Sequence, residues 1–242
     1  PGAEIAEHNG KIFVTTWPGS ELTGFSTPAS LWMSPMIPEG GLTNANADQW
    51  EQVWSVNDYE PDPLVAMTYG GGALASYNGY LFWGTMHVPL TAFQAHAMTY
   101  PQAYQTPEDI MEGFLGTHRA ISIFRGRRFG TPNQNVVLLY GNTSLPVYNN
   151  QEAIWESQPN NMGQPPLFGG SGFNNTFNNY TWTMAVHQNK LLIGTMDWSF
   201  VLDNLEDLIG NIPGFGNITL EDIDNFDFMN IIPTPGADLL YF

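Results

Sequence analysis

The chain contains no cysteine, which excludes disulfide scaffolds, thiolate metal sites and thiol catalysis. Basic residues are scarce as well: six Lys and Arg stand against 23 Asp and Glu, and the formal net charge is −17. Nucleic-acid binding needs clustered Lys and Arg, so a nucleic-acid partner is excluded. No apolar run reaches the roughly 18 residues of a membrane helix, which predicts a soluble chain with no membrane span. We expect Pro1 to be a processed or trimmed terminus.

Other signatures are missing too. We find no Gly-x-Ser-x-Gly elbow, no phosphate loop and no dinucleotide fingerprint. What the 242 residues do contain is 14% aromatic residues with abundant Gly, Pro and Asn, a composition that points to strands and turns. The length is enough to bury the core of one all-β domain or of two small ones.

Three segments of the chain align with one another without gaps, which is the strongest signal in the sequence. They begin at His8, Tyr77 and His187 and read HNGKIFVTTW, YNGYLFWGTM and HQNKLLIGTM. Each is a turn followed by an apolar strand, and an apolar strand also precedes each turn. Asn-Gly is the preferred two-residue hairpin turn, because both positions accept positive φ. Each repeat therefore opens with a tight β-hairpin.

Further strands follow each hairpin. The segments 29–33, 120–124 and 237–241 match one another as third strands. A fourth strand is predicted at 50–54 in the first unit and at 136–140 in the second, with 153–155 as a rival. The units then cover about 1–55, 73–158 and 181–242, and the third ends before a fourth strand.

Tandem four-stranded antiparallel units are typical of a β-propeller, and a β-sandwich with chance hairpin similarity is the alternative. We therefore predict an all-β chain with about three blades. Propellers have four to eight blades, so the ring is incomplete and its open strand edges need a partner. The missing blades would come from another part of a longer polypeptide, an associated chain or a symmetry mate, unless the insertions hide degenerate blades.

One family resemblance rests on these repeats. The run from Gly172 to Thr195, closed by Ala237-Asp238-Leu239-Leu240, resembles a repeat of secreted prokaryotic β-propellers that reads roughly "GFGN…W.M.V.NGKLYVGT…GAELWRS". Trp32-Met33-Ser34-Pro35 is similar to the later part of that pattern. The resemblance covers about half of the chain and implies an exported propeller. It implies little about chemistry. The chain departs from the pattern in its long insertions and in lacking an Asp-Gly turn after the third strand.

Long insertions fall on one predicted face, at about 88–119, 141–181 and 198–236. Long ordered loops often carry function, so this face is a binding surface, or else it packs on a neighbouring domain. Short helices are predicted within them. The first runs from the Thr106 cap and Pro107 to about Gly116, and two more lie at 200–209 and 220–229.

Several side chains are candidates for chemistry. Four of the six basic residues should pair with carboxylates or bind an anionic partner: Arg119, Arg125, Arg127 and Arg128. His87 and Asp197 occupy matching positions after Gly-Thr-Met at the mouth of the long-loop face. With His96 and His118, His87 could form a metal or acid–base site, or serve as an ordinary hydrogen-bonded residue.

The sequence also offers candidate metal and sugar sites. Calcium is possible at Asp222, Asp224 and Asp227, although the spacing is not that of an EF-hand and dipole partners of a helix are the plainer explanation. Glycosylation is possible at four sequons: Asn142, Asn174, Asn179 and Asn217. The eight Trp residues suit carbohydrate stacking if exposed, but most should lie in the core.

These observations predict a non-catalytic, extracellular propeller module. It would bind a protein partner or a surface glycan within a larger cell-surface or filamentous assembly. The alternative is a propeller hydrolase or lactonase-like enzyme with a divalent metal in its central channel.

Overall fold

The structure is a computed structural model that describes residues 1–21, 24–88, 90–199 and 239–241. Strands predominate, and every named strand pair is antiparallel, so the all-β prediction is confirmed. The strands are β1 (Gly2–His8), β2 (Lys11–Thr16), β3 (Gly19–Glu21), β4 (Gly24–Thr27), β5 (Ser30–Met36), β6 (Glu51–Ser55), β7 (Tyr69–Tyr77), β8 (Tyr80–His87), β9 (Ile123–Arg127), β10 (Asn135–Tyr140), β11 (Ser144–Asn149), β12 (Ile154–Pro159), β13 (Asn178–His187), β14 (Lys190–Asp197) and β15 (Leu239–Tyr241). The α-helices are α1 (Pro63–Ala66), α2 (Thr91–Thr99) and α3 (Pro107–Thr117).

The three repeated turns form tight hairpins, as their sequences predict. The turns join β1 to β2, β7 to β8 and β13 to β14. All six turn residues have positive φ, between 48° and 77°, which is the backbone of the two-residue hairpin turn that Asn and Gly favour. The turn residues are Asn9-Gly10, Asn78-Gly79 and Gln188-Asn189.

The sheets keep the strand order of the repeats. One sheet has the order β1-β2-β5-β6, and in the second β7, β8, β9 and β10 pair in turn. The strands β13, β14 and β15 follow the same order, and β13 joins β8 through the single pair Tyr180↔Met86. The predicted fourth strand at 136–140 lies within β10. Its rival at 153–155 runs into β12, which pairs with β11 in a separate hairpin.

The third strand of the second unit starts later than the sequence predicts. β9 begins at Ile123 because the preceding residues make their hydrogen bonds elsewhere. The Ile121 N–H donates to the Asn178 carbonyl (2.8 Å), and the Ser122 N–H donates to Thr85 Oγ1 (2.9 Å). The backbone before β9 thus connects β8 to the start of β13.

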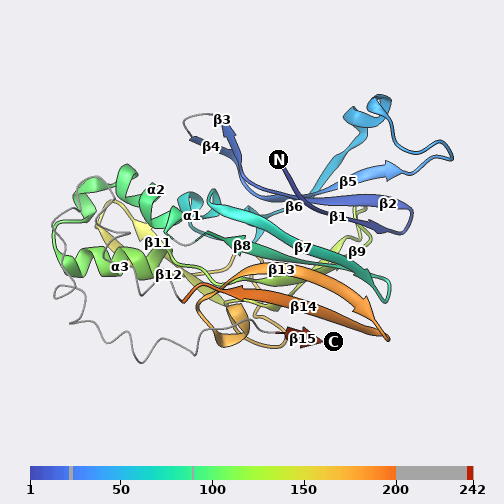
Figure 1. Cartoon of the computed structure of the whole chain (residues 1–242). Helices are drawn as coiled ribbons and strands as arrows, with labels where there is room; N and C mark the ends of the chain where they lie inside the picture. The colour runs from blue at the N-terminus through green and yellow to red at the C-terminus, as the bar shows by residue number, and fades with distance from the viewer. Residues whose placement is uncertain (22–23, 89, 200–238, 242) are drawn as a thin grey trace.

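The strand β7 packs between β1 and β13, the first strands of the other two units (Figure 1). Glycines make this close approach possible. A Cβ on Gly71 would lie 2.7 Å from the Thr16 carbonyl oxygen in the β1–β2 hairpin, and one on Gly72 would lie 3.0 Å from Thr181 Cβ on β13. The hydroxyl of Thr15 donates to the Gly72 carbonyl at 2.8 Å and links the two sheets.

Aromatic side chains fill the core between the sheets. Trp54 lies 4.8 Å from Phe124 between ring centroids, and Trp83 stacks on Phe124 at 5.7 Å. Trp54 and Trp83 are buried, as predicted for core tryptophans, whereas Trp182 on β13 is 59% exposed.

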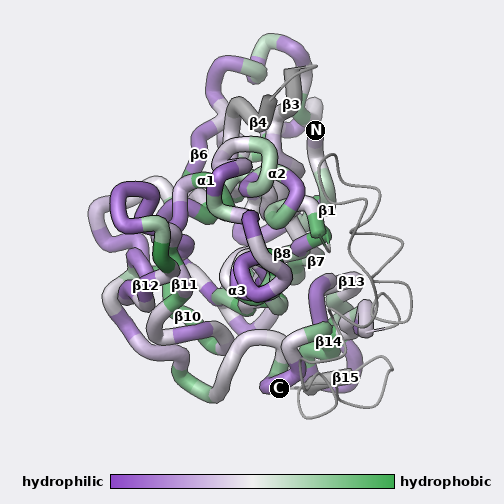
Figure 2. The backbone as a smooth tube through the Cα atoms, turned by 90° about the vertical axis from the view of Figure 1, so that its left-hand side faces the viewer, coloured by the Kyte–Doolittle hydropathy of each residue, from purple (hydrophilic) through white to green (hydrophobic). Residues whose placement is uncertain are grey.

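The inserted segments gather at one end of the sheets. The helices α1, α2 and α3 and the β11–β12 hairpin lie together there (Figure 1). Figure 2 looks onto this end, with the three helices in front of the strands. We call it the insertion end; the hairpin turns lie at the opposite end. The helix predicted from Thr106 is α3. The helices predicted at 200–209 and 220–229 lie outside the described residues. No helix of the described part is long and apolar enough to cross a membrane.

Candidate functional site

Local sequence signals build the insertion end. Thr106 caps α3 in a capping box with Asp109, and Pro107 occupies the first turn. Asp62 caps α1, because one of its oxygens accepts the N–H groups of Leu64 and Val65 at 2.9 Å each. Its other oxygen accepts the Tyr148 N–H at 3.1 Å. Asp62 thus fixes the start of α1 against β11.

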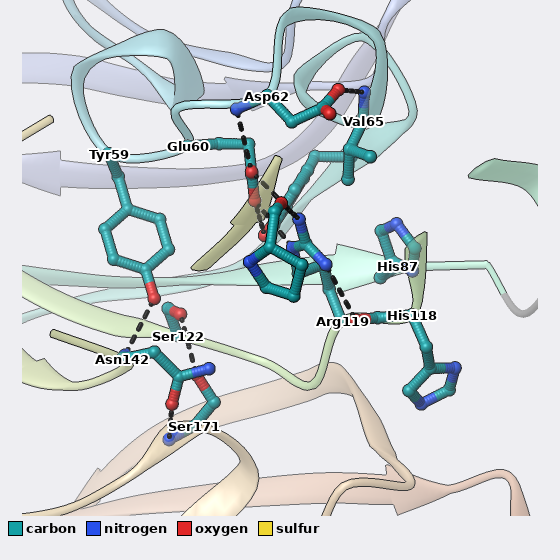
Figure 3. A network of polar contacts seen from close by, with 12 residues as sticks. Tyr59, Glu60, Asp62, Val65, His87, His118, Arg119, Ser122, Asn142 and Ser171 are labelled. Carbon is teal, nitrogen blue, oxygen red and sulfur yellow. Dashed lines mark hydrogen bonds and ion pairs between the residues drawn. The ribbon is translucent and has the colours of Figure 1, made fainter. Parts of the chain in front are cut away.

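A buried ion pair lies beneath this end. Arg119 Nε donates to Glu60 Oε2 at 2.8 Å, and the two side chains are 2% and 0% exposed. The hydroxyl of Tyr69 donates to the same carboxylate oxygen at 2.8 Å, and the Asp62 N–H donates to the other oxygen at 3.1 Å. Figure 3 shows Glu60 and Asp62 beside the guanidinium of Arg119. The carboxylate is well supplied with donors, as a buried charge requires.

The guanidinium of Arg119 has no donor left for a ligand. Besides Glu60, it donates to the backbone carbonyls of Gly116, His118 and Pro146 at 2.7–3.0 Å. These bonds occupy all five N–H donors of an arginine. Burial alone would lower the pKa of Arg119, but the nearby Glu60 carboxylate outweighs burial and raises the pKa above its ordinary value. Of the two roles predicted for Arg119, pairing with a carboxylate is confirmed. Because all five donors are used within the chain, none is left to bind an anionic partner.

A polar pocket of about 370 Å³ lies above this ion pair. Its apolar lining comes from Leu115, Leu145 and Pro146. Its polar lining consists of hydroxyl, amide and imidazole groups: His118, Asn142, Ser171, Asn174 and Thr176. Arg119 also borders the pocket, but its charge is compensated by Glu60. The pocket thus offers neutral hydrogen-bonding groups beside an apolar surface.

His87 and His96 at the insertion end are buried, which favours their neutral forms. The rings of His87 and His118 lie 6.5 Å apart, whereas His96 packs among Tyr104, Tyr148 and Trp155. Burial lowers the pKa of His87 well below its ordinary value and lowers the pKa of His96 to about 4. His87 is 1% exposed. The predicted position of His87 at the mouth of the face is wrong, because α2 and α3 cover it.

Asp197, Arg125 and Arg127 have partners other than the histidines. Asp197 accepts the Asn175 side-chain amide at 2.7 Å and the Ser199 N–H at 2.6 Å, so it braces the loop after β14. The guanidinium groups of Arg125 and Arg127 lie over the Tyr80 ring near the hairpin turns. Arg128 is exposed in the loop after β9. The sequence candidates therefore do not form one site.

The structure bears on the predicted glycosylation and metal sites. The amide of Asn179 is fully buried and donates to the Arg119 carbonyl at 2.7 Å, so a sugar on this residue does not fit the fold. Asn142 is half-buried and Asn174 is exposed, and glycosylation there stays a prediction. Asn217 and the calcium candidates Asp222, Asp224 and Asp227 lie outside the described residues. Within the described ranges, no three His, Asp or Glu side chains are placed to hold a metal ion.

Comparison with known proteins adds no assignment. The sequence matches no protein-family model, and no curated protein is significantly similar to it.

Sequence reasoning missed the residues that organise this end. Glu60, Asp62 and Tyr69 fall in a segment that the repeat analysis treated only as a connection between units. Glu60 and Arg119 are 59 positions apart in the sequence, so no spacing rule could pair them. The Asp62-Pro63 dipeptide was a detectable signal, because Asp before Pro is a common helix start.

Proposed function

We propose that this chain is part of a β-propeller and works as a non-catalytic, extracellular binding module of a larger cell-surface assembly. One observation carries the proposal: β7 is enclosed between β1 and β13, the first strands of the neighbouring units. A side-by-side array of the first strands of successive four-stranded units is the arrangement that propeller blades take around their axis.

The exposed flanks of the array support a continuation by further sheets. The first seven residues of β7 are all buried, because it has a neighbour on each side. The outer first strands differ: Ile5 on β1 is 61% exposed, and Trp182 and Val186 on β13 are 59% and 49% exposed. Large exposed apolar side chains on a sheet face favour a partner surface. We therefore propose that the partner presents another antiparallel sheet to each flank.

The pocket of the insertion end supports a ligand role, and its chemistry favours a neutral carbohydrate. Amide, hydroxyl and imidazole groups match sugar hydroxyls, and no uncompensated charge among the lining residues selects an ion. The volume of about 370 Å³ lies at the lower end of the range of about 300–1,000 Å³ of small-molecule pockets. A metal-dependent hydrolase finds no comparable support among the described side chains.

Carbohydrate binding can be tested by calorimetry with glucose, galactose, mannose and N-acetylglucosamine. We expect at least one sugar to bind and Asn174→Gly to weaken binding about 3- to 10-fold, because one neutral hydrogen bond is lost. Glycine suits this position, since Asn174 has a φ of 68°. Asn189→Gly is the matched control, because Asn189 has a φ of 58° in a hairpin turn away from the pocket. If no sugar binds, or if both variants weaken binding equally, the carbohydrate proposal fails.

A further inference from the structure

A second pocket lies at the hairpin-turn end, beside the turn that joins β7 to β8. Its volume is about 310 Å³. Most of its lining is aromatic or aliphatic: Tyr77, Tyr80, Phe82, Leu139 and Phe168. Arg125 is the charged residue of the lining. The pocket thus combines an apolar interior with a cation.

Two arginines meet at one aromatic ring of this pocket. Arg125 and Arg127 are two positions apart on β9, so both side chains project from the same face of the sheet. Their guanidinium carbons lie 4.7 Å and 5.2 Å from the centroid of the Tyr80 ring. Stacking on the ring stabilises each cation, but it brings two like charges together.

Neither guanidinium is neutralised by the described part of the chain. No carboxylate or other acceptor there receives a hydrogen bond from Arg125 or Arg127, and the Nε atoms of both are buried without a partner. An unpaired buried donor of a charged group is costly. Arg119 differs, because all five of its N–H donors make hydrogen bonds within the chain. In a chain of net charge −17, two uncompensated arginines at one ring favour an external anion.

The apolar walls specify the rest of the ligand. Phe168 and the adjacent Leu167 are each 54% exposed beside the arginines. Their backbone N–H groups donate to the carbonyls of Leu139 (2.9 Å) and Leu138 (3.0 Å), which holds this segment against β10. Exposed apolar side chains that the backbone fixes in place form a ready contact surface. An inorganic anion would leave the apolar part of the pocket unfilled.

We propose that this pocket binds a carboxylate that is joined to an apolar group of ring size. The two guanidinium groups bind the carboxylate, and the apolar group packs against Phe82, Leu139 and Phe168. Such a ligand could be a free organic acid or an acidic side chain next to an aromatic residue on another protein. The site lies at the end opposite the polar pocket, so it stands independently of the carbohydrate proposal.

Calorimetry on the full chain tests the site with four probes. These are 3-phenylpropionate, its neutral amide, inorganic phosphate and the peptide acetyl-Phe-Glu-amide. We expect 3-phenylpropionate or the peptide to bind at least about tenfold more tightly than the neutral amide and phosphate, because charge-assisted hydrogen bonds and the apolar contact are both required. Tighter binding of the peptide identifies a protein source, and tighter binding of the free acid identifies a small molecule; both support the site.

Variants assign the binding to the two arginines. Arg125→Gln and Arg127→Gln should each weaken binding about tenfold or more, and Arg125→Lys should retain part of it because the charge remains. Arg128→Gln removes the same charge from the neighbouring exposed loop and should leave binding unchanged. The proposal is overturned if the neutral amide or phosphate binds as tightly as the acid, if neither acid nor peptide binds, or if Arg128→Gln has the same effect as Arg125→Gln.

Discussion

At the scale of single residues, Glu60 has the largest expected effect on stability. Its carboxylate accepts hydrogen bonds from Arg119, Tyr69 and the Asp62 backbone, all within the buried interior. Glu60→Gln leaves the Arg119 cation buried without its counter-ion. We expect the free energy of unfolding to fall by roughly 3–5 kcal/mol, the cost of breaking a buried ion pair from one side.

Urea denaturation followed by tryptophan fluorescence measures this change. Glu152→Gln is the control, because Glu152 is exposed and should change stability by no more than about 0.5 kcal/mol. Equal stability of the Glu60→Gln variant and the original chain would show that the pair does not hold the insertion end together.

Features that depend on neighbouring residues in the chain could be predicted from the sequence, and contacts between distant segments could not. The positive φ at Asn9-Gly10 and the cap at Thr106 depend on neighbours in the chain, and both were predicted. The Glu60–Arg119 pair and the cover over His87 depend on packing between distant segments. Arg119 pairs with Glu60, whereas Arg125 and Arg127 lie together over Tyr80, although all three are close in the sequence, because Arg119 precedes β9 while the other two lie on it.

At the scale of elements, α3 depends on glycine for its packing. A Cβ on Gly116 would lie 2.4 Å from the Trp155 ring, and Trp155 belongs to the β11–β12 hairpin. In an isolated helix, Gly→Ala stabilises by about 1 kcal/mol. Here we expect Gly116→Ala to destabilise the protein by about 1–3 kcal/mol, because the ring must shift.

Thermal unfolding compares this variant with Leu115→Ala, which alters an exposed position of the same helix. A higher melting temperature for Gly116→Ala than for the original chain would contradict the packing of α3 on the hairpin.

Some helices and strands could be predicted from the sequence and others could not, depending on whether they carry turn or cap residues. Hairpins and α3 carry turn and cap residues, so their sequences identify them. The helix α2 begins after Leu90, which has a φ of 67° and makes no side-chain cap hydrogen bond, so it lacks the usual start signal. Within the 141–181 insertion only 153–155 was considered as a strand, as a rival fourth strand of the second unit, and its pairing with β11 was not predicted.

At the scale of the whole molecule, the central claim is that three units form an open array that further sheets complete. The close packing of β7 between β1 and β13 and the exposed apolar side chains of the outer strands are its basis. Strand order was predictable from the repeat, because similar segments fold alike. The contact between units was not, since it depends on the approach of Gly71 to the Thr16 backbone and of Gly72 to the Thr181 side chain.

Photo-crosslinking in the native source is the most direct test of this claim. Trp182 or Ile5 is replaced by p-benzoylphenylalanine, and Asn133, exposed in a loop, is the control position. We predict that positions 182 and 5 crosslink efficiently to strands of another antiparallel sheet beyond the three units described, and that position 133 does not. Crosslinks that fall only within residues 1–242 of the same chain, or yields no higher than at position 133, would contradict the open array.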